Sequence, residues 1–175
     1  TLPTIRNPRR PGRPTHPTLY TLVAEIREDG VVRDRLSTPY GIRTVAIVEE
    51  PDGRRRLLLN GKPFAIRGTA EYEHLLGGSH AFSSEQVAAR VAQVEAAGFN
   101  AFRDGHYPHN LRYGERIAED GLLWWPQFSA HNWFDNPAYR ANFLSLLGDW
   151  VRERRNNPAV FLWGLQNEKP ASQGV

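Results

Sequence analysis

The sequence lacks two residue types and any long apolar run, and each absence narrows the chemistry. No cysteine occurs among the 175 residues, which excludes disulfide frameworks, thiolate zinc sites and cysteine nucleophiles. No apolar stretch approaches the roughly 18 residues of a membrane-spanning helix, and the Pro- and Arg-rich beginning does not have the pattern of a signal peptide. Methionine is absent even at position 1. We therefore expect a piece of a longer protein, whose compartment the sequence leaves open.

The positive charge of the chain is mild and unevenly distributed. The net charge is +3, with 11 Arg against 7 acidic residues (+4) in residues 1–56 and 11 Lys or Arg against 12 acidic residues (−1) in residues 57–175. Three arginines stand among prolines near the beginning, and Arg54–Arg56 follow a turn. Neither group forms a helical stripe that would follow a phosphate backbone. We expect no nucleic-acid partner and no membrane partner.

Residues 1–56 have the pattern of antiparallel strands. The first strand alternates imperfectly between Leu19 and Arg27 and ends at Glu28-Asp29-Gly30, which is a hairpin signal. Further strands are predicted over residues 31–36 and 40–49, before the turn Pro51-Asp52-Gly53. A complete sandwich of the immunoglobulin type has about seven strands in about 100 residues. Residues 1–56 are therefore predicted to be the closing strands of an incomplete β-sandwich.

From residue 57 onward, strands alternate with helices. Short apolar runs predict strands over residues 64–67, 99–103, 122–125 and 159–165. Ser83 and Gln86 form a capping box at the start of the first helix, Gly121 ends a second helix over residues 111–120, and Asn136-Pro137 begins a third.

Four strand–helix steps in residues 57–175 amount to half of an eight-stranded barrel, which takes about 250 residues. A doubly wound open sheet is the alternative, but the residues after Arg67 lack the Gly-rich phosphate turn that such a fold usually places after its first strand. We therefore predict the first half of a (β/α)8 barrel over residues 57–175.

Polar side chains follow the predicted strands at the edge where barrel enzymes place their chemistry. Glu73 and His74 follow the first strand, Arg103 and His106 the second, Gln127 and His131 the third, and Asn167 and Glu168 the fourth. Polar loops alone would give a similar composition, so the clustering by itself favours a site only weakly.

Glu168 is the sharpest candidate, because it follows the apolar run of residues 160–165. An acid at the boundary of a dry interior tends to have a raised pKa, which suits a general acid. Capping or pairing with the next helix explains the position equally well. Asn167 can serve a sugar hydroxyl or a turn, Trp163 can stack on a sugar ring or pack in the core, and Arg103 can clamp a carboxylate or pair with Asp104 or Glu73.

Two other classes of site find little support. Six histidines are present, but no pair has the His-Glu-x-x-His spacing of a zinc site. No Gly-x-Ser-x-Gly elbow of a serine hydrolase occurs. We expect no metal and no cofactor.

An ordered series of short motifs resembles glycoside hydrolase family 2, which includes β-galactosidases, β-glucuronidases and β-mannosidases. The motifs run over nearly the whole chain: His16-Pro17-Thr18-Leu19-Tyr20, Tyr40-Gly41-Ile42-Arg43, Leu59-Asn60-Gly61-Lys62-Pro63, Glu73-His74, Gly98-Phe99-Asn100-Ala101-Phe102-Arg103, His106-Tyr107-Pro108 and Trp163-Gly164-Leu165-Gln166-Asn167-Glu168.

The resemblance implies an immunoglobulin-like sandwich followed by a (β/α)8 barrel, and a retaining mechanism with two glutamates. It implies that Glu168 is the acid/base, that Asn167 holds the sugar 2-hydroxyl, that Arg103 orients the nucleophile and that His106 lines the sugar subsite. The nucleophile would come from a seventh strand, beyond Val175. We also expect Glu73, His74 and Trp163 to contact the substrate.

Two departures from the family pattern affect the choice of sugar. Glu71-Tyr72-Glu73 stands where β-galactosidase-like members have Arg-His-Glu, and Gln127 has no adjacent acid, so the magnesium ligands of some galactosidases are not supported. We predict a fragment of an exo-acting retaining β-glycosidase, most similar to β-galactosidases, whose partners are a carbohydrate and the remainder of the same polypeptide. A non-catalytic carbohydrate-binding half-barrel and a purely structural module are the alternatives, and homo-oligomerisation is left open.

Overall fold

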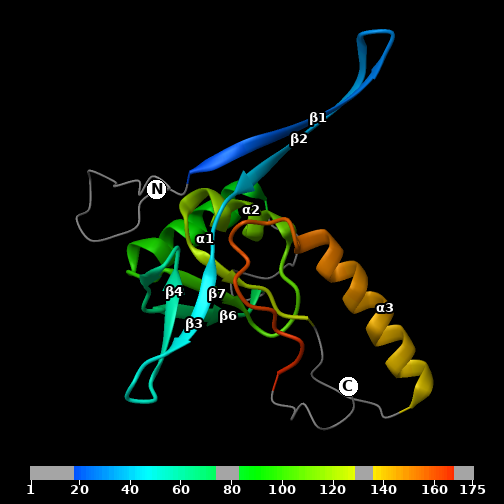
Figure 1. Ribbon diagram of the computed structural model, residues 1–175. Helices are drawn as coiled ribbons and strands as arrows, with labels where there is room; N and C mark the ends of the chain where they lie inside the picture. The colour runs from blue at the N-terminus through cyan, green and yellow to red at the C-terminus, as the bar shows by residue number, and fades with distance from the viewer. Residues whose placement is uncertain (1–17, 74–82, 129–135, 168–175) are drawn as a thin grey trace. The chain divides into compact units, whose positions relative to one another are not determined.

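The computed structural model describes residues 18–73, 83–128 and 136–167 (Figure 1). The chain divides into two compact units, residues 1–64 and 65–175. The elements follow in the order β1 (Leu19–Glu28), β2 (Val31–Gly41), β3 (Val45–Glu49), β4 (Arg55–Leu59), β5 (Lys62–Pro63), β6 (Gly68–Glu71), α1 (Ser84–Ala96), β7 (Ala101–Asp104), α2 (Leu111–Asp120), β8 (Leu123–Trp125) and α3 (Pro137–Arg154).

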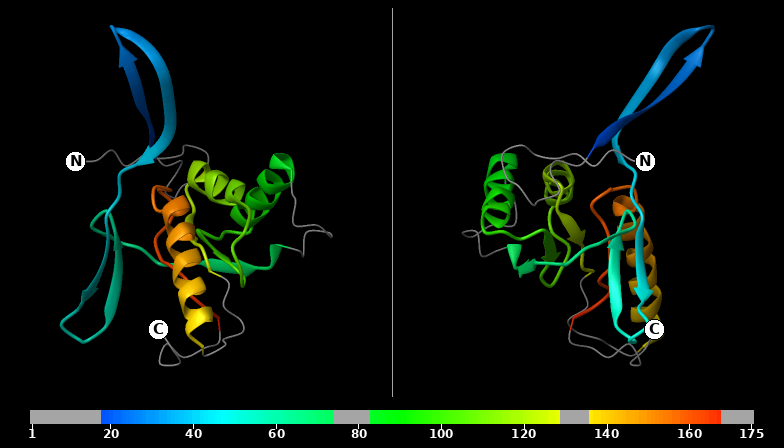
Figure 2. Two further views of the ribbon diagram at one scale, coloured as in Figure 1. Left: turned by 90° about the vertical axis from the view of Figure 1, so that its right-hand side faces the viewer. Right: turned by 60° about the vertical axis from the view of Figure 1, so that its left-hand side comes forward.

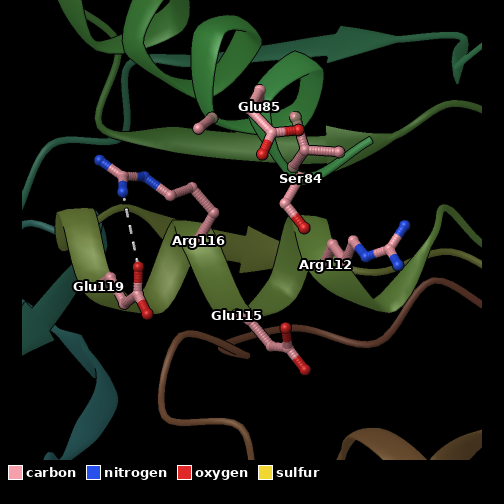
Figure 3. A pocket seen from close by; sticks show the side chains of 8 residues that line it. Ser84, Glu85, Arg112, Glu115, Arg116 and Glu119 are labelled. Atoms are coloured by element: carbon pink, nitrogen blue, oxygen red, sulfur yellow. Dashed lines mark ion pairs between the residues drawn. The ribbon is translucent and has the colours of Figure 1, made fainter. Parts of the chain in front are cut away.

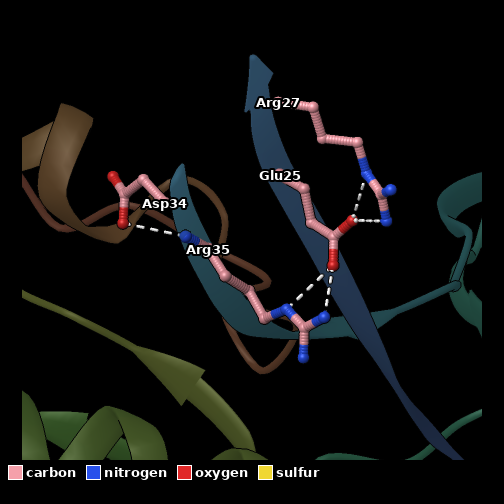
Figure 4. A network of polar contacts seen from close by, with 4 residues as sticks. All are labelled: Glu25, Arg27, Asp34 and Arg35. Carbon is pink, nitrogen blue, oxygen red and sulfur yellow. Dashed lines mark hydrogen bonds and ion pairs between the residues drawn. The ribbon is translucent and has the colours of Figure 1, made fainter. Parts of the chain in front are cut away.

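The first unit begins with a long two-stranded hairpin, β1–β2. Asp29 and Gly30 form its turn with φ angles of 51° and 78°, the left-handed conformation that tight hairpin turns require. The predicted hairpin is confirmed, but β2 continues through residue 41 as one strand, so the predicted break near residue 37 is wrong. Glu25 accepts hydrogen bonds from Arg27 at 2.7 Å and from Arg35 at 2.8 Å (Figure 4), which joins the two strands.

The strands β3, β4 and β5 form a second antiparallel sheet. A tight turn at Asn60 and Gly61, with φ angles of 51° and 72°, returns the chain so that β5 pairs with β4. The apolar run of residues 64–67 therefore lies in a connection, and the first parallel strand is β6, so the predicted strand over residues 64–67 is wrong. The domain boundary expected after residue 56 falls inside β4, which spans residues 55–59. This strand is paired with β3 on one side and with β5 on the other.

The second unit contains the parallel sheet β6–β7–β8, with α1 and α2 packed against each other beside it (Figure 2). The predicted helix starts are confirmed. Ser83 and Gln86 form the capping box of α1, Asn136 accepts the backbone N–H of Tyr139 at the start of α3, and Gly121 ends α2 in a left-handed conformation.

The core of the second unit lies between the helices and the sheet. It contains Val87, Val91, Val94, Phe102, Tyr113, Ile117, Ala118, Leu122, Trp124, Ala159 and Val160. Helix α2 approaches β8 closely because Gly114 has no side chain: a Cβ there would lie 2.7 Å from Cη2 of Trp124. A smaller cluster joins α3 to Phe128 through Phe143 and Trp150.

Residues 159–164 run parallel to β8 without forming a regular strand. The pairing consists of isolated bridges from Trp124 to Val160 and from Gln127 to Gly164. Backbone hydrogen bonds of 2.7 Å from Trp124 to Ala159 and 2.6 Å from Phe128 to Gly164 hold the segment in place. The predicted fourth strand is therefore present as a parallel segment beside β8, with fewer ladder bonds than expected.

Candidate functional site

The carboxyl ends of the parallel strands meet at one edge of the second unit. Arg103 on β7 is in register with Ala70 on β6 and with Trp125 on β8. The bridge between Gln127 and Gly164 extends this edge toward Asn167. In barrels of parallel strands, this edge carries the functional side chains.

Arg103 lies at the centre of a polar cluster at this edge. Its Nη2 atom donates to Oε1 of Gln127 at 2.6 Å and to Oδ1 of Asn167 at 3.0 Å. Its guanidinium lies over the ring of Trp125, 4.8 Å from the ring centroid. Among the residues that the structure describes, the Arg103 side chain bonds neutral amides, and the alternative of an ion pair with Asp104 or Glu73 is not found.

The contacts of Arg103 fix the orientation of both amides. An arginine can only donate hydrogen bonds, so the atoms facing it must be the amide oxygens. The NH2 groups of Asn167 and Gln127 therefore take no part in the contacts with Arg103. Within the described part of the chain, Nε2 of Gln127 is buried without a hydrogen-bond acceptor, and Nε of Arg103 is likewise buried without one.

Gln127 is the residue that sequence reasoning left out of the site. Its position at the end of the third predicted strand was the available signal. It is fully buried, and the absence of a side chain at Gly164 makes room for it: a Cβ at residue 164 would lie 3.2 Å from Cβ of Gln127 and 2.9 Å from Nε1 of Trp125.

His106 joins the same cluster from the loop after β7. Its Nδ1 atom lies 3.5 Å from Oε1 of Gln127, and its ring meets the ring of Tyr72 edge-on at 5.0 Å between centroids. A proton on Nδ1 suits the amide oxygen of Gln127, and this tautomer leaves Nε2 as an acceptor. Arg103, His106 and Asn167, predicted as neighbours, therefore lie together.

Glu73 is buried, and its carboxylate accepts the backbone N–H of Asn110 at 3.0 Å, just before α2. Burial raises the pKa of the nearby Tyr113 hydroxyl, and the charge of Glu73 raises it further. The contact described for Glu73 is therefore with the protein. Glu71 at the end of β6 is likewise paired with Arg90 of α1, whose Nε atom donates to it at 2.6 Å.

Trp163 lies apart from the cluster around Arg103 in its described contacts. Its ring meets that of Trp150 on α3 edge-on, with 5.2 Å between the centroids. The aromatic ring that does accompany Arg103 belongs to Trp125. Two further predicted residues, Glu168 and His74, lie outside the described residues, as does His131.

A shallow groove of about 380 Å³ lies between α1 and α2, away from the strand ends (Figure 3). Its lining is Ser84, Glu85, Val87, Ala88, Arg112, Glu115, Arg116 and Glu119. Arg116 is paired there with Glu119 at 3.6 Å. The groove shares no residue with the cluster around Arg103, so it is not part of the candidate site.

Two further properties of the described residues bear on other functions. They contain no group of three or more His, Asp or Glu side chains arranged to hold a metal ion. None of their helices has the length and apolar character needed to cross a membrane.

Comparison with protein families gives a match over most of the chain. Residues 52–175 match the model described as "Glycosyl hydrolases family 2, TIM barrel domain". Among curated proteins, a beta-galactosidase of Alteromonas mediterranea is 30% identical over 159 residues, and a beta-glucuronidase of Chlorocebus aethiops is 33% identical over 154 residues. These alignments cover 86% and 82% of this chain, but only 15% and 22% of the respective relatives.

A solved structure has the same arrangement of strands and helices. The β-glucuronidase from Ruminococcus gnavus in complex with D-glucuronic acid superposes with a TM-score of 0.78 at 25% identity. The match covers 88% of this chain and 26% of that one. The chain thus spans about a quarter or less of the length of these relatives.

Proposed function

The chain belongs to glycosyl hydrolase family 2, and from this premise we propose that it supplies half of the catalytic barrel of a retaining exo-β-glycosidase. The observation that carries the proposal is the cluster of Arg103, Gln127, His106 and Asn167 at the strand ends. Asn167 directly precedes Glu168 in the sequence. The proposed acid/base is therefore adjacent in the chain to a residue held by Arg103.

In the proposed mechanism, Glu168 protonates the glycosidic oxygen as the bond to the anomeric carbon breaks. A second carboxylate, about 5 to 5.5 Å away in retaining enzymes, attacks that carbon and forms a glycosyl-enzyme. Glu168 then takes a proton from a water molecule as that water attacks the anomeric carbon, which breaks the bond to the second carboxylate and releases the sugar. We propose that the second carboxylate comes from the later part of the barrel, beyond Val175.

The described side chains suit three supporting roles. Because Oδ1 of Asn167 faces Arg103, the NH2 group of Asn167 is the part that can donate to a sugar hydroxyl. The guanidinium of Arg103 is bonded to neutral amides, so its charge is available to a carboxylate such as the nucleophile. The ring nitrogen of His106 that faces away from Gln127 can accept from a sugar hydroxyl.

The sugar is proposed to be a terminal β-galactoside. The relatives bear the names of both β-galactosidases and β-glucuronidases. The test is to measure kcat/KM on aryl β-galactosides, β-glucuronides and β-mannosides, and we expect the highest value for the β-galactoside. A preference for glucuronide would replace the proposed substrate and keep the proposed reaction.

The first unit is proposed to be the end of an immunoglobulin-like sandwich that precedes the barrel. Its five strands are antiparallel, as in such sandwiches. Apolar side chains including Leu22, Ile26 and Ile47 are exposed on them. A second sheet packed on these strands would bury side chains of this kind.

Replacing Glu168 by Gln in the full-length enzyme tests the proposed reaction. We expect turnover of a glycoside with a poor leaving group to fall by 10² to 10⁴, roughly the usual contribution of a general acid. Formation of the glycosyl-enzyme from a dinitrophenyl glycoside should fall much less, because that leaving group needs little protonation.

Glu119→Gln, on the exposed side of α2, is the matched control and should leave both rates unchanged. Equal losses on good and poor leaving groups would remove Glu168 from the acid role. Glycan binding without any turnover would instead identify a carbohydrate-binding protein, and an unchanged Tm at saturating sugar would identify a structural module.

A further inference from the structure

A buried polar pair lies behind the strand ends and takes no part in the proposed reaction. Asp104, the last residue of β7, is 0% exposed, and His109 is 2% exposed. Nδ1 of His109 lies 3.6 Å from Oδ1 of Asp104. Burying a carboxyl group costs free energy unless hydrogen bonds compensate for the lost water. The partners of Asp104 therefore show which segments it holds together.

Asp104 connects three segments of the second unit. Its Oδ1 atom accepts the indole N–H of Trp124 on β8 at 2.8 Å. Its Oδ2 atom accepts the backbone N–H of His109 at 3.3 Å. The carboxyl group of β7 is thereby bonded to the neighbouring strand and to the loop that follows its own strand.

The His109 ring is enclosed by aromatic side chains. Its centroid lies 5.7 Å from that of Phe102, 5.6 Å from Tyr107 and 5.3 Å from Tyr113. The ring therefore fills a place between β7 and α2, which fixes the end of the loop against the core.

The loop between Asp104 and α2 is the one that carries His106 to the cluster around Arg103. It is held at its start by a hydrogen bond of 2.9 Å from Gly105 N–H to the carbonyl of Glu71. It is held at its end by the bond from Asn110 N–H to Glu73. The contacts of Asp104 and His109 hold the intervening stretch.

We propose that Asp104 and His109 form a positioning pair that sets the place of the His106 ring against Gln127. This inference rests on the proposed function, since His106 matters only if the strand ends bind a sugar. Asp104 is buried beneath the loop and does not reach the substrate itself. Its effect is transmitted by the backbone between residues 104 and 109.

The surroundings of Asp104 show that burying its charged form is costly. Burial raises the pKa of Asp104 to about 7, while the hydrogen bonds from Trp124 and from the His109 backbone, the charge of Arg154 and the hydrogen bond from the Gln127 backbone act in the opposite direction. The charged form of this carboxyl group is therefore disfavoured by burial and partly compensated by its contacts.

The test is a double-mutant cycle between Asp104→Asn and His106→Ala in the full-length enzyme. Asparagine keeps the size of Asp104, but it offers one acceptor oxygen in place of two, so the N–H donors of Trp124, His109 and Gln127 cannot all keep their partner. We expect kcat/KM to fall 10- to 100-fold, because small displacements of active-site groups can lower rates by a factor on the order of 10². In the His106→Ala background, the same substitution should cost less than about threefold.

Asp120→Asn is the matched control. Asp120 is a largely buried carboxylate of α2, bonded at 2.7 Å to Arg116, and it has no connection to the loop of His106. This substitution should lower Tm but leave kcat/KM unchanged. Losses from Asp104→Asn and His106→Ala that simply multiply would overturn the proposal, as would an equal effect of Asp120→Asn on kcat/KM.

A second readout does not depend on turnover. In protein labelled with ¹⁵N-histidine, the ring resonances of His106, identified by their loss in His106→Ala, should shift in Asp104→Asn and not in Asp120→Asn. Unchanged resonances would overturn the positioning role even in an active enzyme. A wild-type protein without glycosidase activity would refute the proposed function, while the resonances would still decide this inference.

A milder substitution covers the case in which Asp104→Asn does not fold. Trp124→Phe keeps an aromatic ring and removes the indole donor to Asp104, together with part of a buried ring. We expect a loss of about threefold in kcat/KM that disappears in the His106→Ala background. A loss that persists in that background would count against the pair.

Discussion

The two units differ in what they do with their apolar side chains. In residues 18–64, no residue is buried, and Ile47 on β3 is 67% exposed. In the second unit, Ile117 on α2 is 0% exposed within a cluster that joins α1 and α2 to the parallel sheet. Both regions have regular secondary structure, so regular backbone pairing does not by itself imply a core.

The comparison also extends to charge. In the first unit, the carboxylate of Glu25 is partly exposed and bonded to two arginines on the hairpin surface. In the second unit, the carboxyl group of Asp104 is wholly buried and bonded to an indole and a backbone amide. Removal from water, more than the number of partners, decides how strongly such a group affects stability.

The largest expected effect is a pH dependence of stability that originates at Asp104. Its pKa rises from an ordinary value of 3.8 to about 7 in the folded protein, so the folded state binds the proton more tightly. The stabilisation is complete below pH 4 and is lost as the pH rises through 7. At about 1.4 kcal/mol per pKa unit, the loss is on the order of 4 kcal/mol.

Denaturant unfolding of wild type and Asp104→Asn between pH 4 and pH 8 measures this effect. The free energy of unfolding of wild type minus that of Asp104→Asn should fall with rising pH. A rise in this quantity would contradict the assignment.

The next effect compares two isoleucines. Ile117→Ala should lower the free energy of unfolding by about 2 to 5 kcal/mol, because it removes buried methylenes and leaves a cavity. Ile47→Ala should lower the free energy of unfolding of the full-length protein by more than about 0.5 kcal/mol, the usual limit for an exposed residue, because the proposed sandwich would cover that side chain. A large loss for Ile47→Ala would show that another surface covers β3, which is what the proposed sandwich requires.

The smallest effect concerns the ion pairs on the hairpin. Glu25→Gln weakens the contacts to Arg27 and Arg35, and exposed pairs of this kind are worth about 0 to 1 kcal/mol. The change in the free energy of unfolding should shrink further in 1 M salt, because exposed charges are screened there. A loss above 2 kcal/mol that is insensitive to salt would mean that Glu25 is buried in the full-length protein.

The helix boundaries could be predicted from sequence because their causes are local. The side chains of Ser83 and Gln86 satisfy backbone groups within one turn, and Gly121 adopts a left-handed conformation that a non-glycine residue disfavours. These requirements involve residues close together in the chain. Their patterns therefore predict the same element in most surroundings.

The strands were harder because their partners are distant. The run of residues 64–67 has the composition of a strand, yet Asn100 uses its side chain to bond Arg67 N–H at 2.8 Å and the carbonyl of Ala65 at 2.9 Å. These bonds hold the run as a connection, and β6 begins after it. The requirement for Gly114 beside Trp124 is equally non-local.

The same distinction applies to the candidate site. The positions of Arg103, His106 and Asn167 followed from the rule that parallel strands gather their carboxyl ends. The contact of Trp163 with Trp150 on α3 did not follow, because it depends on how residues 159–164 leave the edge of β8. The roles of Glu168 and His74 remain predictions.

Gly164 gives the site a steric control that carries no charge and makes no side-chain contact. The place where a side chain at residue 164 would begin is taken by the stem of Gln127 and the indole nitrogen of Trp125. Both of these residues touch the guanidinium of Arg103. Any side chain at residue 164 would push on two neighbours of that cation at once, so Gly164 helps to set the alignment of the Arg103 guanidinium.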